Sequence, residues 1–131
     1  MANFGRPEPR FDIDFSYGNV GERLRETHYA WIMDGSGKVE VKRNRYLDLH
    51  LYVEQSCNKG RGGCYEPSGI NVTEAEVWDY VIADTGICLS IPTRTLRRAM
   101  NGLGAQAAEE EDGDNPTRGK LVALQTILEH A

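Results

Sequence analysis

Two stretches of this 131-residue chain alternate strictly between apolar and polar residues, and this alternation constrains the fold more than any other feature. In 38–42, two valines alternate with Lys38, Glu40 and Lys42. In 47–55, leucines and a valine alternate with polar side chains. Because side chains two residues apart face the same side of a strand, both stretches predict half-buried strands.

Turn-forming residues suggest how these strands are connected. Asp-Gly-Ser-Gly at 34–37, between the apolar run 31–33 and the strand 38–42, predicts a β-hairpin. Asp84-Thr85-Gly86 predicts the turn of a second hairpin, between strands at 80–83 and 87–91. Residues 57–64 are rich in glycine and predict a flexible basic loop, and 1–16 read as an arm with a short extended piece.

Helical signals lie between and after the strands. Apolar residues at i, i+4 spacing predict a helix over 18–29, and the capping box Thr73-Glu74-Ala75-Glu76 predicts a short helix ending before residue 80. Further helices are expected over 93–101 and, with an apolar stripe, over 117–130. Helices interspersed with strands predict an α/β or mixed α+β domain.

Composition fits one domain with appended segments. The fractions of hydrophobic (40%) and charged (27%) residues are ordinary for a globular protein. We expect a single domain over 1–103, an acidic linker over 104–116 and a C-terminal amphipathic helix over 117–131. The net charge is −5, but 1–105 hold 13 bases against 14 acids. The body is therefore nearly neutral, and the acidity of the whole chain does not exclude a nucleic-acid partner.

Several classes of protein are disfavoured. No apolar run approaches the ~20 residues that span a bilayer, and the N-terminus lacks the pattern of a signal peptide. A cytoplasmic protein is expected. Cys57, Cys64 and Cys88 contain no C-x2-C pair, so reduced thiols are favoured over a zinc site.

Glu40 and Lys42 are the residues most suggestive of chemistry. They share one face of the predicted strand, and the hairpin would bring Asp34 toward Glu40. Two carboxylates bind Mg2+ through hard oxygens and leave positions for water and a phosphate, while a lysine stabilises phosphate charge. A Glu-x-Lys pair is also common on an ordinary solvated strand. Its context favours chemistry, because a helix bearing Glu22 precedes it and Arg43 follows it.

The order of these motifs resembles the PD-(D/E)XK nuclease superfamily. The resemblance covers about residues 14–100 and is closest to small phage and bacterial members and archaeal-type Holliday-junction resolvases. It rests on Glu22, Asp34, Glu40-Val41-Lys42, an aliphatic strand ending at Glu54, Pro67-Ser68-Gly69-Ile70, Thr73 to Trp78, and Ile91-Pro92-Thr93. It implies a restriction-endonuclease-like central mixed β-sheet flanked by helices.

The resemblance also implies roles for individual residues. Asp34 and Glu40 would bind Mg2+, which Mn2+ could replace, and Glu22 would bind it directly or through water. Lys42 would position the nucleophile. The spacing from Asp34 to Glu40 is short for the superfamily, so Asp34 could instead be a turn residue. In that case Glu54 or Asp14 would supply the missing acid.

Basic and polar residues around this strand predict contacts with DNA: Arg43, Arg45, Lys59, Arg61 and Gln55. We therefore expect a metal-dependent deoxyribonuclease that acts on branched or duplex DNA as a homodimer. A phage-encoded protein that acts in the host cytoplasm is compatible with this expectation. A non-catalytic nucleic-acid-binding module on the same scaffold is the main alternative. A structural or inhibitory protein whose acidic segment mimics DNA is a weaker one.

Overall fold

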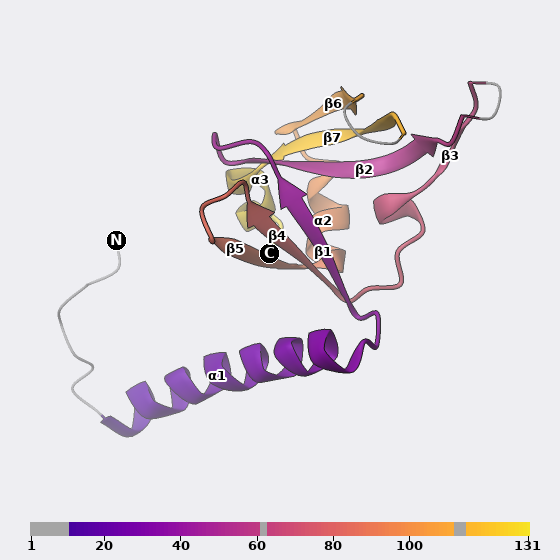
Figure 1. Ribbon diagram of the computed structural model, residues 1–131. Coiled ribbons are helices and arrows are strands. Elements are labelled where there is room, and N and C mark those ends of the chain that lie inside the picture. The colour runs from indigo at the N-terminus through magenta and orange to yellow at the C-terminus, as the bar shows by residue number, and fades with distance from the viewer. Residues whose placement is uncertain (1–10, 61–62, 112–114) are drawn as a thin grey trace. The chain divides into compact units, whose positions relative to one another are not determined.

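The computed structural model describes residues 11–60, 63–111 and 115–131, with side chains from residue 17 onward (Figure 1). The described residues form three α-helices and seven strands, which confirms the mixed α/β class. The chain divides into two compact units, Met1–Ser36 and Gly37–Ala131, and each is described by itself.

The first unit contains one long helix, α1 (Phe11–Asp34). The helix predicted over 18–29 is confirmed but longer, because 11–16 are helical rather than extended and 31–33 continue the helix. The predicted first hairpin is therefore wrong. A three-residue apolar run does not distinguish a strand from a helical turn. Gly35, at φ +66°, follows α1 in the left-handed conformation typical of a helix C-terminus.

The second unit holds a three-stranded mixed sheet made of β1 (Val39–Asn44), β4 (Val77–Ile82) and β5 (Cys88–Pro92). β1 runs parallel to β4, and β4 pairs antiparallel with β5, so the second predicted hairpin is confirmed.

The helix predicted from Thr73 is wrong. The hydroxyl of Thr73 does accept a hydrogen bond from the amide of Ala75, at 3.1 Å, but the chain then enters β4. A run of β-branched and aromatic residues from Val77 onward favours the strand.

A four-stranded antiparallel sheet has the order β3-β2-β7-β6. Its strands are β2 (His50–Asn58), β3 (Tyr65–Pro67), β6 (Ala105–Glu110) and β7 (Thr117–Ala123). The strand predicted over 47–55 is confirmed with a later start. The strands thus form two sheets rather than one central sheet.

The predicted acidic linker 104–116 and C-terminal helix 117–131 are largely wrong. Most of these residues form β6 and β7, and only α3 (Leu124–Glu129) is helical. Across this strand pair the guanidinium of Arg118 donates to the carboxylate of Glu109 at 3.0 Å. The acidic run is therefore partly neutralised by a neighbour eight or more residues away, which its local composition does not reveal.

The core lies where the two sheets meet α2 (Thr93–Ala99), which confirms the start of the helix predicted over 93–101. Its largest fully buried side chains are Leu51, Val53, Trp78, Tyr80, Leu96 and Val122. A short 3-10 helix, η1 (Gly69–Asn71), contacts β2. At Gly69, with φ +53°, an added Cβ would lie 2.3 Å from the carbonyl oxygen of Glu54, so this close approach requires glycine.

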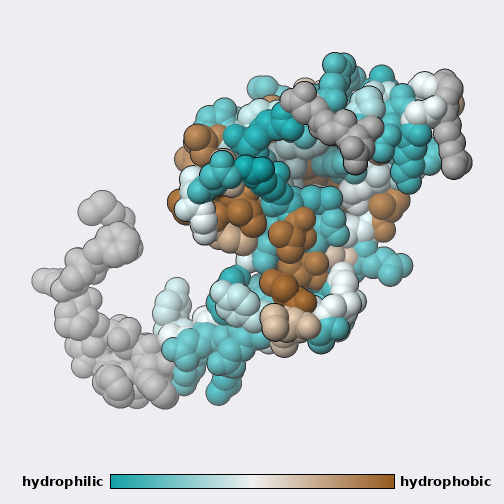
Figure 2. All heavy atoms as spheres, viewed as in Figure 1, coloured by the Kyte–Doolittle hydropathy of each residue, from teal (hydrophilic) through white to brown (hydrophobic). Residues whose placement is uncertain are grey.

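An apolar groove of about 230 Å³ lies between the segment joining β1 to β2 and the β4–β5 turn. Three of its lining residues, Leu47, Leu49 and Ile87, are more than half exposed. Figure 2 shows hydrophobic side chains gathered at this end of the β1–β4–β5 sheet. Among the described residues, no helix is both long and apolar enough to cross a membrane.

Candidate active site

Glu40 and Lys42 lie on the same face of β1, as the alternation predicts. The ammonium nitrogen of Lys42 is 2.8 Å from a carboxylate oxygen of Glu40. In the parallel register Glu40 is level with Trp78 and Lys42 with Tyr80, so the pair shares a sheet face with two buried aromatic side chains. The Lys42 nitrogen is 5.4 Å from the centroid of the Trp78 ring. The pair therefore lies at the edge of the core.

A second carboxylate, that of Glu54, acts electrostatically on Tyr80. The hydroxyl of Tyr80 donates to the carbonyl oxygen of Tyr52 at 3.0 Å. Burial raises the pKa of Tyr80 above its ordinary value, and the negative charges of Glu40 and Glu54 raise it further. Two carboxylates from two different sheets thus act electrostatically on one phenol, and Lys42 is paired to one of them. Glu54 is the acid that the sequence analysis named as a substitute for Asp34.

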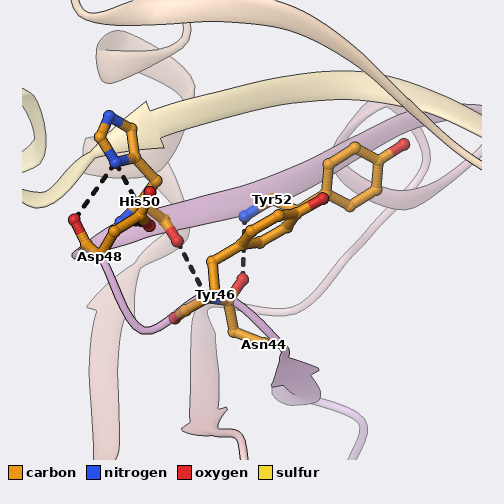
Figure 3. Close-up of polar contacts among 5 residues, drawn as sticks. All are labelled: Asn44, Tyr46, Asp48, His50 and Tyr52. Atoms are coloured by element: carbon orange, nitrogen blue, oxygen red, sulfur yellow. Dashed lines mark hydrogen bonds and ion pairs between the residues drawn. The ribbon is translucent and has the colours of Figure 1, made fainter.

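Asn44 fixes the end of β1 against β2 (Figure 3). Its side-chain oxygen accepts from the amide of Tyr52 at 3.0 Å, and its side-chain nitrogen donates to the carbonyls of His50 at 2.9 Å and Tyr46 at 3.1 Å. The buried amide thereby satisfies backbone groups of β2 much as a neighbouring strand would. This junction holds the strand of Glu40 and Lys42 beside the strand of Glu54.

A second group of polar side chains surrounds this junction. His50 approaches Asp48, with its Nδ1 atom 3.4 Å from the carboxylate (Figure 3). The hydroxyls of Tyr52 and Thr117 are hydrogen-bonded at 2.8 Å. Burial raises the pKa of Tyr52, and the hydrogen bond to Thr117 opposes that shift. Burial and the nearby Glu110 carboxylate raise the pKa of Tyr46.

The other predicted metal ligands belong to the first unit. Glu22 is exposed on α1. Asp34 is the last residue of α1, and its carboxylate accepts a hydrogen bond from the amide of Ser36 at 2.8 Å. This is the turn role that the sequence analysis left open. Asp14 lies on α1, and its side chain is outside the described part.

The predicted DNA contacts are spread over the second unit. Arg43 pairs with Asp84, and Arg45 lies 3.6 Å from Glu110. The two arginines line an open hollow together with Ala83. Lys59 is exposed after β2, and Gln55 lies where the β2–β7 register shifts. Arg61 is outside the described residues.

The side chains available as metal ligands can be compared with the expected Mg2+ site. Across residues 17–60, 63–111 and 115–131, no three His, Cys, Asp or Glu side chains gather closely enough to hold a metal ion. Glu40 and Glu54 supply hard oxygen donors of the kind Mg2+ prefers, and Mg2+ commonly uses one or two carboxylates together with waters and substrate phosphates.

The sequence analysis did not predict the hydrogen bonds of three residues: Asn44, Tyr80 and Arg97. Asn44 continues the alternation of Glu40 and Lys42, so its inward face was predictable. The contacts of Tyr80 and Arg97 join segments far apart in the chain and carry no local signal.

Comparison with known proteins identifies no relative: no family model matches the chain, and no curated protein or solved structure is significantly similar to it. The resemblance to PD-(D/E)XK nucleases therefore stays a prediction.

Proposed function

We propose that this protein is a Mg2+-dependent endonuclease that hydrolyses phosphodiester bonds of DNA in the cytoplasm, with branched DNA as its preferred substrate. The observation that carries the proposal is the ion pair of Lys42 with Glu40 on β1, beside the buried Tyr80, whose pKa both Glu40 and Glu54 raise. Paired carboxylates beside a lysine supply the charges that phosphodiester hydrolysis needs.

Each residue has a distinct role in this proposal. Glu40 and Glu54 would hold the metal ion. The ion supplies a water of lowered pKa and neutralises charge on the phosphate. Lys42, now paired with Glu40, would donate to a phosphate oxygen or orient the attacking water. The buried face of Trp78 holds the lysine on this side of the sheet.

The proposal is tested by cleavage of a fluorescent four-way junction, a nicked duplex and single strands, with Mg2+ or Mn2+ and with EDTA as control. We expect Lys42→Ala to lower the single-turnover rate by about 100-fold or more, the usual cost of removing a charge-stabilising donor. Lys38→Ala, an exposed lysine just before the same strand, is the matched control. Equal cutting by Lys42→Ala and wild type would contradict the role of Lys42.

A non-catalytic nucleic-acid-binding module is the second candidate. It is favoured by the turn role of Asp34 and by the lack of a three-ligand metal cluster among the described residues. Tight binding of DNA by the wild type without cutting of any substrate would support this candidate and end the nuclease proposal.

A further inference from the structure

A hollow of about 210 Å³ lies between α2, η1 and the position in β2 where its register with β7 shifts. Its lining residues are Gln55, Ile70, Asn71, Arg97, Met100 and Asn101. The guanidinium of Arg97 donates to the carbonyls of Ile70 at 3.3 Å and Thr73 at 3.2 Å. These bonds hold the arginine in one orientation at the wall of the hollow.

The positive charge of Arg97 is not compensated locally. Within the part of the chain that the structure describes, no carboxylate forms an ion pair with Arg97, and its partners are neutral carbonyls. The side-chain amides of Gln55 and Asn101 also form no hydrogen bond with described residues. A guanidinium without a paired carboxylate and two side-chain amides without hydrogen bonds to described residues thus line one hollow, which is large enough to admit a phosphate group. A guanidinium held in this way suits the oxygens of a phosphate group.

A second hollow, of about 430 Å³, adjoins the first at Gln55, which lines both. Its floor includes Gly119 and Ala107, and its wall carries Arg118. The Arg118 guanidinium pairs with Glu109 and lies 3.7 Å above the ring of Tyr65. An aromatic ring and a second guanidinium next to a hollow that admits a phosphate group are features of surfaces that bind single-stranded nucleic acid.

We propose that the hollow at Arg97 binds a backbone phosphate of a nucleic-acid strand, with Gln55 and Asn101 as further donors. Arg118 and Tyr65 would contact the adjacent nucleotide. The proposal rests on the proposed function, because it assigns this surface to the same DNA substrate. It places the strand on residues that the candidate active site does not use.

The test measures the binding of DNA in the absence of divalent metal ions, so that no metal-dependent cleavage occurs. The 15N-labelled full-length protein is titrated in EDTA with a short single-stranded oligonucleotide, and separately with inorganic phosphate. The side-chain amide signals of Gln55 and Asn101 are recorded by NMR. We expect saturable shifts of both signals with the oligonucleotide. We expect Arg97→Gln to weaken this binding about tenfold or more, as the loss of charge-assisted hydrogen bonds would.

Two variants keep the result interpretable. Arg94→Gln removes an exposed arginine of the same helix that does not line the hollow, and it should change affinity by less than about twofold. Gln55→Glu leaves the bonds of Arg97 intact but places a carboxylate in the hollow, so it should weaken binding as much as Arg97→Gln does. Circular dichroism checks that each variant is folded.

Three outcomes would overturn the inference. The first is unchanged affinity for the oligonucleotide in both Arg97→Gln and Gln55→Glu, and the second is an equal loss of affinity in Arg94→Gln and Arg97→Gln. The third is that the amide signals shift with inorganic phosphate but not with the oligonucleotide. The last would mean a free-anion site. The failure of the proposed function would be recognised independently of these outcomes. If the wild type never cuts DNA but Arg97→Gln loses binding, the hollow stands and the nuclease proposal does not.

Discussion

Asn44 shows how one side chain joins two sheets. It is 2% exposed, and its amide serves three backbone groups of the β1–β2 connection and β2. A buried amide in such a position is costly to remove, because its backbone partners lose their hydrogen bonds inside the protein.

We therefore expect Asn44→Ala to lower the free energy of unfolding by about 2 kcal/mol or more, measured by urea denaturation. Asn101→Ala, at an exposed asparagine, is the control and should have little effect on stability. A loss below about 0.5 kcal/mol for Asn44→Ala, within the range of an ordinary surface change, would show that the junction does not depend on this amide.

Tyr80 makes stability depend on pH in the alkaline range. Its pKa is raised above the ordinary value of 10.0, chiefly by burial and then by Glu40 and Glu54. The folded state therefore keeps the phenol neutral, whereas the unfolded chain ionises it above about pH 10. The contribution of the neutral phenol to the free energy of unfolding is therefore complete below that pH and is lost as the pH rises further.

Wild-type stability should accordingly fall between about pH 9.5 and 11.5, and the slope should be smaller in Tyr80→Phe. At neutral pH, Tyr80→Phe should cost about 1 kcal/mol through the lost bond to Tyr52. Tyr29→Phe, at an exposed tyrosine of α1, should keep the wild-type slope. Identical pH profiles for wild type and Tyr80→Phe would contradict this account.

At the scale of elements, β2 is the strand on which the second unit is built. It pairs with β3 and β7, receives Asn44 and Tyr80 at its edge and contacts η1. On the side of β7, an added Cβ at Gly119 would lie 2.1 Å from the carbonyl oxygen of Val53. The two strands meet there with no room for a side chain.

Gly119→Ala should consequently destabilise the protein by about 1–3 kcal/mol, the usual cost of overpacking, as seen in thermal or urea unfolding. Gly21→Ala is the control, because nothing lies within 4 Å of a Cβ at that position of α1. It should be neutral or slightly stabilising. Equal behaviour of the two variants would show that β2 and β7 separate at little cost.

The sequence predicted the elements whose signal is local. The alternation around Glu40 and along 47–55, the β4–β5 turn and the start of α2 were all found. It also predicted that Glu40 and Lys42 share a face. Three predictions were wrong: the hairpin at 34–37, the helix at Thr73 and the last helix. Short apolar runs fit the periods of both a helix and a strand, and pairing with strands distant in the sequence determined which of the two formed. The grouping of Glu54 with Glu40 depends on contacts between sheets and had no local signal.

At the scale of the whole molecule, the apolar groove bears on assembly. Leu47 and Leu49 are exposed at its edge, and Leu49 is held at φ +64°. Arg43, near the end of β1, and Asp84, in the β4–β5 turn, form an exposed pair of opposite charge. A face that carries both charges can pair with a copy of itself across a two-fold axis. A dimer would give the proposed nuclease one active site for each strand of a duplex, so we propose that this groove is the interface of a homodimer.

Leu47→Lys should convert the dimer to a monomer in light scattering after size-exclusion chromatography, because a charge in an apolar interface is not compensated. Leu103→Lys, at a fully exposed leucine outside the groove, should remain dimeric. A monomeric wild type, or a Leu47→Lys variant that is still dimeric, would contradict this interface.

In the proposed active site, Glu40 and Glu54 hold a divalent ion beside Lys42. The most direct measurement is paramagnetic broadening of backbone amide signals by Mn2+ in the 15N-labelled full-length protein, with and without DNA. The account predicts the strongest broadening at Glu40, Glu54 and Tyr80, and its loss in a Glu40→Gln, Glu54→Gln double variant. Broadening centred on the acidic run 109–111 instead, unchanged by the double variant, would contradict the claim.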